Sequence, residues 1–377
     1  MSRQYLPQGY GEPALLKPLC ELFDALLHEP RLARTGQPGP MADAAPMTDS
    51  VPGTHAGLLR VAVALSGGAD SAMLAVHAAI AARQYPAIEL HCFHIHHGLQ
   101  HAADGWREHA HRLAAGLGLP CHSLRVSVAS DSGKGIEAAA REARYAGLKR
   151  LAGFTEVAHI LLAHHRDDQT ETVLMRLLRG AGPTGLAAMA PISQRDGLVY
   201  LRPWLETDRD LILTTAQEYA RLSGWAAVDD PTNTDDAYTR GAVRRRLAPV
   251  LNERWPAWRS ILLRHARQAR ELSGLLEEIA AEDFAGLDPS VDARNFSLAA
   301  WRKLGSQRQV LVLRHWLRRH GLRAPTEARM HELCRQLRGL HALGHDRAMR
   351  LRHEGHWISC ERGRVQLLRI NDSPENR

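Results

Sequence analysis

The chain lacks the features of a metal-cluster protein and of a membrane protein. Its five cysteines are scattered and odd in number, and no C-x-x-C occurs, so neither a zinc knuckle nor an iron–sulfur site is indicated. No apolar run approaches the ~20 residues of a membrane span. The N-terminus also lacks the basic, apolar and small-residue order of a signal peptide. These absences predict a cytoplasmic protein with reduced thiols.

Lysine is scarce, and acidic residues are outnumbered. Only four of the 48 basic residues are lysine, and the formal net charge is +7 with a pI near 9.4. An excess of positive charge predicts an anionic partner. Because an arginine-rich composition does not by itself identify that partner, the location of the arginines is more informative than their number.

Apolar runs and helical patterns alternate between residues 58 and 228. Strands are expected at 59–65, 88–95, 121–128, 157–163 and 198–202, and helices at 70–83, 103–117, 136–152, 167–179 and 208–223. This alternation predicts an α/β fold with a doubly wound, mostly parallel sheet. Ligands of such sheets bind beyond the carboxyl ends of the strands, so the residues that follow each strand are the candidates for function.

The rest of the chain is arranged around this α/β domain. We expect an N-terminal extension and linker over 1–57, the catalytic domain over 58–235, a basic helical region over 236–290 and a small α+β C-terminal domain over 291–377. A weak helical pattern at 12–29 falls in the extension. Helices at 298–320 and 326–338, followed by strand-like runs to 369, fall in the last domain.

A Gly-rich loop follows the first strand directly. VAVALSGGADS places Ser66, Gly67, Gly68, Ala69, Asp70 and Ser71 between a buried strand and an Ala-rich helix. In this setting backbone N–H groups and a helix N-terminus converge on phosphate, and glycine allows close approach. Asp70 would hold Mg²⁺ against a polyphosphate or cap the helix. The loop is neither a Walker A motif nor a dinucleotide G-x-G-x-x-G. SGGADS resembles the pyrophosphate loop (PP-loop) of the ATP-pyrophosphatase superfamily.

Polar residues follow two of the later strands. HIHHGLQ, which contains His97, follows the second strand, and neighbouring histidines point to opposite sides of an extended chain, which disfavours a metal site. A role near phosphate or base and simple filling of a polar loop both remain open. After the third strand, Glu137, Arg141 and Arg144 share one helix face and form either a solvated ion-pair row or a nucleotide-facing surface.

Three acids follow the fourth strand. Asp167, Asp168 and Glu171 lie in the first turn or two of a helix, where the macrodipole alone favours acids. Their position beyond a strand end also suits Mg²⁺ or an amine. Both interpretations remain open.

A basic segment begins near residue 240. Residues 240–271 contain nine arginines against two acids, with Trp255 and Trp258 interleaved. A solvated helix usually carries balancing acids, so their scarcity favours a phosphate backbone as the partner. Arg240, Arg244, Arg245 and Arg246 are the candidates for binding it.

The motifs together resemble one family. SGGADS, HIHHGLQ, GIEAAAREARY, LAHHRDDQTETVLMRLLRGAG, RPWL and DDPTN…YTRGAVRRRLAP, in this order, resemble tRNA(Ile)-lysidine synthase. The chain differs from the family pattern at Gln100 and at Arg240-Gly241, where arginine and Arg-Asn are usual. The resemblance implies a PP-loop ATPase fold (adenine nucleotide alpha hydrolase-like) and a tRNA-binding C-terminal region.

The resemblance also implies a reaction. Free lysine would be joined to C2 of the wobble cytidine of tRNA(Ile) with a CAU anticodon, through an adenylated tRNA, with release of AMP and pyrophosphate, and the codon read would change from AUG to AUA. ATP, Mg²⁺, lysine and tRNA are the implied ligands, and a homodimer is considered. Ser66 to Ser71 would hold the phosphates, and Asp70 would hold the metal. Asp167, Asp168 and Glu171 would bind the metal or the lysine ammonium. Glu137, Arg141 and Arg144 would bind lysine or phosphate.

Two alternatives remain open. A tRNA cytidine thiolase of the same superfamily would normally carry paired C-x-x-C cysteines, which this chain lacks. A non-catalytic RNA-binding protein with a decayed loop would not be expected to keep an intact SGGADS. ATP consumption that depends on tRNA would separate the enzyme from the binding protein.

Overall fold

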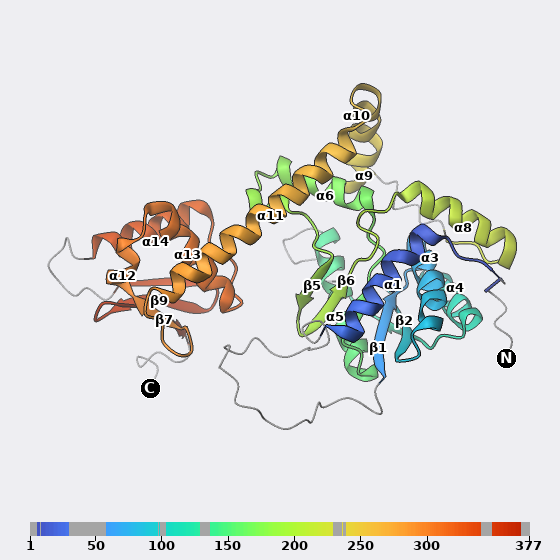
Figure 1. Ribbon diagram of the computed structural model, residues 1–377, viewed down its shortest axis with the longest axis horizontal. Helices are drawn as coiled ribbons and strands as arrows, with labels where there is room; N and C mark the ends of the chain where they lie inside the picture. The colour runs from blue at the N-terminus through green and yellow to red at the C-terminus, as the bar shows by residue number, and fades with distance from the viewer. Residues whose placement is uncertain are drawn as a thin grey trace. The chain divides into compact units, whose positions relative to one another are not determined.

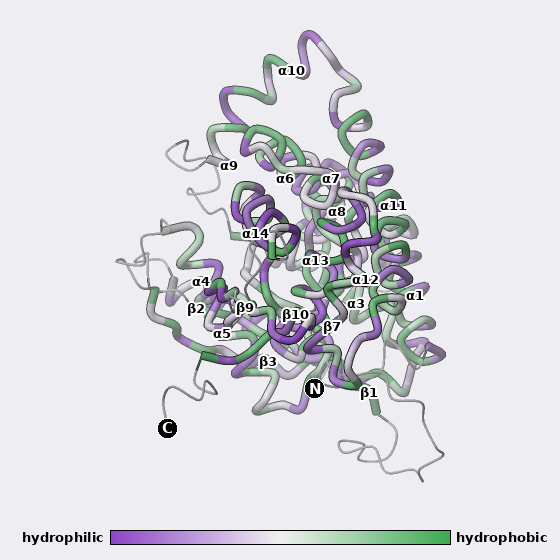
Figure 2. The backbone as a smooth tube through the Cα atoms, turned by 90° about the vertical axis from the view of Figure 1, so that its left-hand side faces the viewer, coloured by the Kyte–Doolittle hydropathy of each residue, from purple (hydrophilic) through white to green (hydrophobic). Residues whose placement is uncertain are grey.

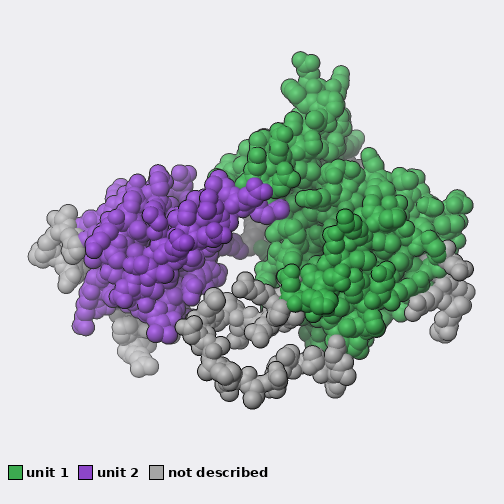
Figure 3. Space-filling model, in the orientation of Figure 1, with its two compact units in different colours: residues 1–37, 46–268 green, residues 38–45, 269–377 purple. Residues whose placement is uncertain are grey.

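The computed structural model describes residues 6–7, 9–29, 58–96, 98, 103–128, 136–228, 236, 239–340 and 349–370, without the side chains of 103, 136 and 137. The chain divides into two compact units, residues 1–37 with 46–268 and residues 38–45 with 269–377 (Figure 3). The division falls inside one long helix, α11 (Trp258–Ala285). Within the described residues, no helix is both long enough and apolar enough to cross a bilayer.

Unit 1 is built on a six-stranded sheet of order β3-β2-β1-β4-β6-β5 (Figure 1). Its strands are β1 (Leu59–Ala64), β2 (Ile88–His96), β3 (Cys121–Arg125), β4 (His159–Leu161), β5 (Ile192–Arg195) and β6 (Leu198–Leu201). All neighbouring strands are parallel except β5 and β6. The five strands predicted from the sequence are confirmed, and so is the mostly parallel α/β class.

Helices follow the strands as predicted, with ends that shift by up to three residues. They are α3 (Ala69–Ala81), η1 (Ala82–Gln84), α4 (Ala103–Leu117), α5 (Ile136–Thr155), α6 (Arg166–Leu178), α7 (Pro183–Leu186) and α8 (Arg209–Ser223). The basic region forms α9 (Thr239–Ala242), the π-helix η3 (Val243–Leu247), α10 (Ala248–Arg254) and α11. Figure 2 shows hydrophilic and hydrophobic residues mixed along α11, as expected of an amphipathic helix.

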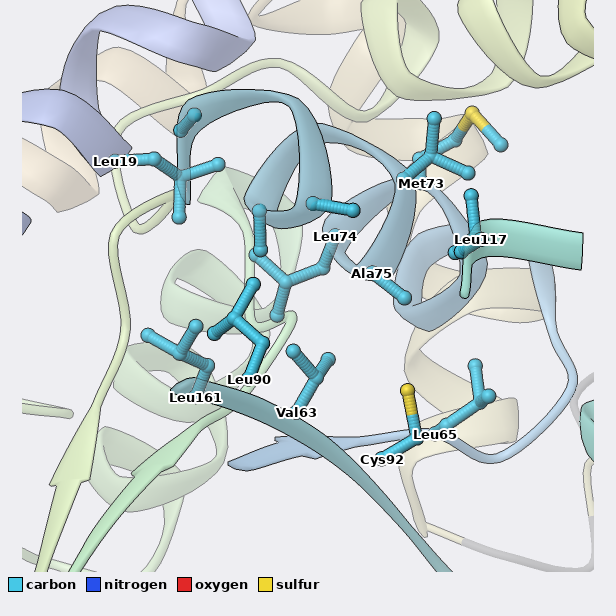
Figure 4. Packing of buried hydrophobic residues seen from close by; sticks show 14 of the residues in the cluster. Leu19, Val63, Leu65, Met73, Leu74, Ala75, Leu90, Cys92, Leu117 and Leu161 are labelled. Carbon is cyan, nitrogen blue, oxygen red and sulfur yellow. The ribbon is translucent and has the colours of Figure 1, made fainter. Parts of the chain in front are cut away.

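The core of unit 1 forms between α3 and the central strands. Figure 4 shows Val63 of β1, Leu65 just after β1, Leu90 of β2 and Leu74 of α3 packed together, and all four are nearly inaccessible to solvent. β1 pairs with β2 on one side and with β4 on the other. The strand that leads into the Gly-rich loop is therefore an interior strand of the sheet, paired on both sides, which gives the loop a firm base.

The N-terminal helix belongs to the same core. The sequence placed this segment in an extension before the catalytic domain, but α1 (Pro13–His28) buries four apolar side chains in the α3 core, namely Leu15, Leu19, Phe23 and Leu26. The Trp204 indole N–H donates to the Leu15 carbonyl at 3.0 Å. The apolar stripe that predicted a helix is thus the face by which α1 packs.

His77 is a neutral histidine that joins this helix to α3. It is fully buried; the Glu12 amide donates to its Nε2 at 3.1 Å, so Nδ1 carries the proton and donates to the Met73 carbonyl at 2.8 Å. Burial lowers the pKa of His77 to about 4, from an ordinary value near 6.5. Protonation would break the bond with Glu12.

The stability of unit 1 should therefore fall in mild acid. Because the folded-state pKa lies below the unfolded value, His77 binds more protons in the unfolded state, and its contribution is lost as the pH falls from about 6.5 towards 4, by roughly 3 kcal/mol in all. Denaturant unfolding between pH 7 and 4.5 measures this loss. His77→Gln should flatten the pH dependence, whereas His28→Gln, at an exposed position on α1, should not. Equal slopes for His77→Gln and wild type would contradict this assignment.

Unit 2 places helices on one face of a four-stranded antiparallel sheet of order β7-β10-β9-β8. Its elements are β7 (Asn295–Ser297), α12 (Leu298–Lys303), α13 (Ser306–Arg319), α14 (Glu327–Gly339), β8 (Met349–His353), β9 (His356–Glu361) and β10 (Arg364–Arg369). In Figure 1 the strands lie below α13 and α14. The expected small α+β character is confirmed.

The single helix expected over 298–320 is wrong, because the chain breaks into α12 and α13. Leu304 is extended, with φ −70° and ψ 147°, and Gly305 caps α13. The buried Gln309 amide donates to the carbonyls of Leu304 at 2.9 Å and Trp301 at 3.3 Å. These bonds satisfy carbonyls at the end of α12 that a continuous helix would have used itself.

Candidate active site

The loop after β1 has the geometry of a phosphate cradle. Gly67 adopts φ +97°, a conformation that side chains disfavour, and Gly68 begins α3 without a side-chain cap in the described chain. The Ser66 amide donates to Ser71 Oγ at 3.1 Å, and Ser71 Oγ donates to the Gly68 carbonyl at 3.1 Å. The buried Ser71 thus shapes the loop, while the first amides of α3 stay available to an anion.

Asp70 lies in the first turn of α3, at the edge of this loop. Its Oδ2 lies 3.8 Å from His165 Nε2, and its Oδ1 lies 3.6 Å from Arg209 Nε. Oδ1 is inaccessible to solvent, and it accepts no hydrogen bond within the described part of the chain. An ionised oxygen in this state would gain from a cation.

No three His, Cys, Asp or Glu side chains converge to form a metal site of their own among the described residues. Mg²⁺ at a nucleotide is usually held by one or two carboxylates together with the substrate phosphates. Asp70 beside the loop fits that pattern, so the residues present suit a nucleotide-bound Mg²⁺.

His165 connects the loop to the acids of α6. It lies after β4 and is 3% exposed at its side chain; its Nε2 is 3.4 Å from Asp168 Oδ2, and its backbone N–H donates to the same oxygen at 3.2 Å. Two carboxylates, Asp70 and Asp168, therefore flank one imidazole. The sequence prediction missed His165 and Arg209 as site residues; the position of His165 just beyond a strand end was the signal available.

Asp168 and Glu171 are buried and paired with arginines from the basic segment. Arg244 Nε and Nη2 donate to the two oxygens of Glu171 at 2.6 and 3.0 Å, and its Nη2 lies 3.4 Å from Asp168 Oδ1. Arg240 Nε lies 3.3 Å from Glu171 Oε2, and its Nη2 donates to Thr172 Oγ1 at 3.2 Å. Residues about 70 positions apart thus form one charged cluster.

The two buried acids of the cluster differ in the direction of their pKa shifts. Burial of the Asp168 carboxyl raises its pKa, but the nearby His165, His164 and Arg240 outweigh burial and hold the pKa below its usual value. Burial lowers the pKa of Arg244, but the bonds to Glu171 outweigh burial and raise it. Burial raises the pKa of the Glu171 carboxyl above its usual value, although the bonds to Arg244 oppose this rise. The arginines therefore act against burial in a site where electrostatic interactions are strong.

Asp167 has a different environment from its two neighbours. Its Oδ1 lies 3.2 Å from Arg259 Nε at the start of α11, whereas the other two acids bond with α9 and η3. Arg259 also lies over the Trp258 ring, with its guanidinium carbon 4.6 Å from the ring centroid. The structure thus brings Asp168 and Glu171 together and leaves Asp167 outside the pair.

The predicted residues on α5 are described in part. Arg141 and Arg144 are exposed, and Arg141 Nη2 donates to the Tyr145 hydroxyl at 3.4 Å. The charge of Arg141 lowers the pKa of His164 and that of Arg202, a buried residue of the RPWL segment, although burial is the larger cause in both. Arg141 of α5 therefore places a positive charge near His164, which follows β4. His97, Gln100 and the side chain of Glu137 lie outside the described residues.

The arginines of the basic segment divide into two kinds. Arg240 and Arg244 are half-buried against α6, whereas Arg245 and Arg246 are exposed, with Arg246 bonded to Asp236 at 2.8 and 3.0 Å. Arg244, Arg245 and Arg246 occupy the π-helix η3, a rare conformation that is often found at functional sites. Neighbouring arginines of η3 therefore have different surroundings: Arg244 packs against α6, whereas Arg245 and Arg246 are exposed.

Two family models match parts of this chain. Residues 48–251 match a PP-loop domain model, and residues 296–366 match a TilS substrate binding domain. A solved structure, the U34-tRNA thiolase NcsA from Methanococcus maripaludis with its [4Fe-4S] cluster, is 16% identical, with a TM-score of 0.46, over 56% of this chain and 72% of that one.

Curated relatives match over most of the chain. The tRNA(Ile)-lysidine synthase of Bordetella pertussis is 56% identical over 82% of this chain and 95% of its own length. That of Ralstonia nicotianae is 44% identical over 76% of this chain and 61% of its own length. The PP-loop model and the substrate-domain model together cover both units. The chain therefore belongs to the tRNA(Ile)-lysidine synthase family.

Proposed function

We propose that this enzyme joins free lysine to C2 of the wobble cytidine of tRNA(Ile) bearing a CAU anticodon, through an adenylated tRNA. Family membership supports an ATP-using ligase that acts on this tRNA and forms lysidine. The observation that carries the finer proposal is the position of a charged acid cluster one imidazole away from the phosphate loop. ATP and an amine could therefore be held side by side.

The chemistry requires activation before substitution. The C2 carbonyl of cytosine is a poor electrophile, and its oxygen is a poor leaving group. Attack of this oxygen on the α-phosphorus of ATP breaks the α–β bond, releases pyrophosphate and makes AMP the leaving group. The lysine amine then forms the C2–N bond, AMP departs with the oxygen, and the amine loses a proton.

Each group of side chains has a proposed task. Ser66 to Ser71 hold the β- and γ-phosphates through the α3 amides, and Asp70 positions a bound Mg²⁺, which would neutralise charge on the departing pyrophosphate. Asp168 and Glu171 bind the lysine ammonium, and Arg240 and Arg244 favour the ionised forms of these acids against the effect of burial. Arg141 and Arg144 face the developing phosphate charge.

The direct test supplies the purified protein with ATP, labelled lysine and a tRNA(Ile) transcript with a CAU anticodon. Label should enter RNA, with equimolar AMP and pyrophosphate, and a transcript with a changed wobble base should take up none. AMP release that does not need tRNA, or binding of tRNA without ATP consumption, would contradict the proposal. Sedimentation with and without tRNA would show whether the enzyme forms a homodimer.

The exposed arginines of η3 should bind the tRNA backbone. Changing Arg245 and Arg246 to Gln together should weaken tRNA binding, and the slope of log K against log salt should shrink by roughly 0.7 to 0.9 for each phosphate that the protein no longer neutralises. ATP affinity should not change. Arg83→Gln, an exposed change in η1 before the amino end of β2, is the matched control. An unchanged slope would show that these arginines only solvate the surface.

A further inference from the structure

One face of the unit 2 sheet combines arginines with a partly buried tryptophan. Strand alternation and register place Met349, Ile358 and Val365 on the face that packs against the helices. The opposite side, which we call the outer sheet face, carries Arg350, Arg352, Trp357, Ser359, Glu361, Arg364, Gln366 and Leu368, of which Ser359 is buried.

Register sets these residues in three rows. Arg352 lies opposite Trp357, which lies opposite Leu368; in the next row Arg350 lies opposite Ser359, which lies opposite Gln366. Residues two apart on a strand are about 7 Å apart. Trp357 therefore has Arg352 beside it in the same row and Arg350 in the next row.

Trp357 is an unusual residue to leave at such a surface. The other tryptophans of unit 2, Trp301 and Trp316, are fully buried, whereas Trp357 is only partly buried. Within the described chain, no aromatic ring or guanidinium stacks on its ring, although such pairs form elsewhere, as between Phe296 and Trp316. The ring does not serve the core of this unit.

The charge of the face is complementary to RNA. Its three rows carry Arg350, Arg352 and Arg364 against one acid, Glu361, which lies opposite Arg364. Arg364 is further bonded to Asp288, while Arg350 and Arg352 are exposed at the β8 edge. Positive charge therefore gathers beside the unstacked ring, as in proteins that stack bases while they track a backbone.

We propose that the outer sheet face binds an unpaired stretch of the tRNA substrate, with one base stacked on Trp357 and the flanking phosphates at Arg350 and Arg352. This rests on the proposed function, because tRNA is the RNA that the enzyme must hold. A sheet face with an aromatic residue on an interior strand suits a splayed single strand and not a helix, whose bases are stacked on one another. The interaction is tolerant of sequence, since every base has a π-face.

The test uses the full chain with a labelled oligouridine and a blunt-ended RNA duplex as separate probes. Trp357→Ala should weaken oligouridine binding roughly 5- to 100-fold, which corresponds to one base stack, and leave duplex binding unchanged. Trp357→Phe should largely keep the affinity, and Val291→Ala, at a fully exposed position of unit 2, should keep it all. Trp357→Leu, which preserves apolar volume without a π-face, should behave like Trp357→Ala even if the latter unfolds.

Salt dependence separates stacking from charge. Arg352→Gln should reduce the oligouridine salt slope by about 0.7, whereas Trp357→Leu should lower affinity at an unchanged slope, because stacking releases no counterions. Equal affinity of Trp357→Leu and wild type, or an equal loss on both probes, would overturn the proposal. Lysidine formation by the wild type is scored separately, so its absence would refute the proposed function without touching the oligouridine result.

Discussion

Asp70→Asn is expected to abolish nearly all AMP release, with a fall in kcat on the order of a hundredfold to a thousandfold. Asparagine keeps the size of the side chain but removes the charge that would hold Mg²⁺ beside the loop. Oδ1 of Asp70 accepts no hydrogen bond from the described residues. The contacts that weaken with the charge are the long ones to Arg209 and His165, at 3.6 and 3.8 Å, so the fold should persist. The release of AMP from labelled ATP, in the presence of tRNA and lysine, measures the effect.

A metal-holding role predicts more than a loss of rate. The Mg²⁺ concentration that gives half-maximal activity should rise in Asp70→Asn, while tRNA affinity and the unfolding midpoint stay close to those of the wild type. Asp196→Asn, which changes an exposed acid on the β5–β6 turn, should leave all three quantities unaltered. Wild-type rates in Asp70→Asn would show that the loop works without this carboxylate.

The fold of unit 1 could be predicted because its signals are local. Short apolar runs bounded by turn residues identified β1, β2, β3, β4 and β6, and the order of strand, glycine turn and helix fixed the loop. β5 was missed although Asp196-Gly197 is a hairpin signal; both residues have positive φ, 54° and 83°, as a two-residue turn requires. Ile192–Arg195 has no apolar alternation strong enough to predict a strand by itself.

The individual residues of the candidate site could be predicted from the sequence, but the contacts between them could not. Asp168 and Glu171 could be proposed from their place after a strand, and Arg240 and Arg244 from their charge. That these four residues pair depends on the path of the chain between them, which no local pattern encodes. The sequence therefore assigned all four arginines of 240–246 to RNA, whereas the structure gives two of them partners on α6.

Replacing Glu171 should separate the two steps of the reaction. If Glu171 binds the lysine ammonium, Glu171→Gln should leave adenylation of tRNA in place and raise the KM for lysine by more than tenfold, since a charged hydrogen bond contributes about 1.5–3 kcal/mol. Thermal unfolding must be followed too, because Arg244 loses a charged partner in a buried site. Glu218→Gln, at an exposed position on α8, is the matched control.

The same variant decides which substrate is activated. With α-labelled ATP, tRNA and no lysine, label should appear on the RNA of both wild type and Glu171→Gln after a rapid acid quench. Added lysine should discharge it as AMP quickly in the wild type and slowly in the variant, because the oxygen of the base, and not lysine, attacks the α-phosphorus. If lysine were activated first, lysine alone would drive exchange of pyrophosphate into ATP, no label would reach the RNA, and Glu171→Gln would block adenylation itself. The acids of α6 would then act before the tRNA does, and the order proposed for this site would be reversed.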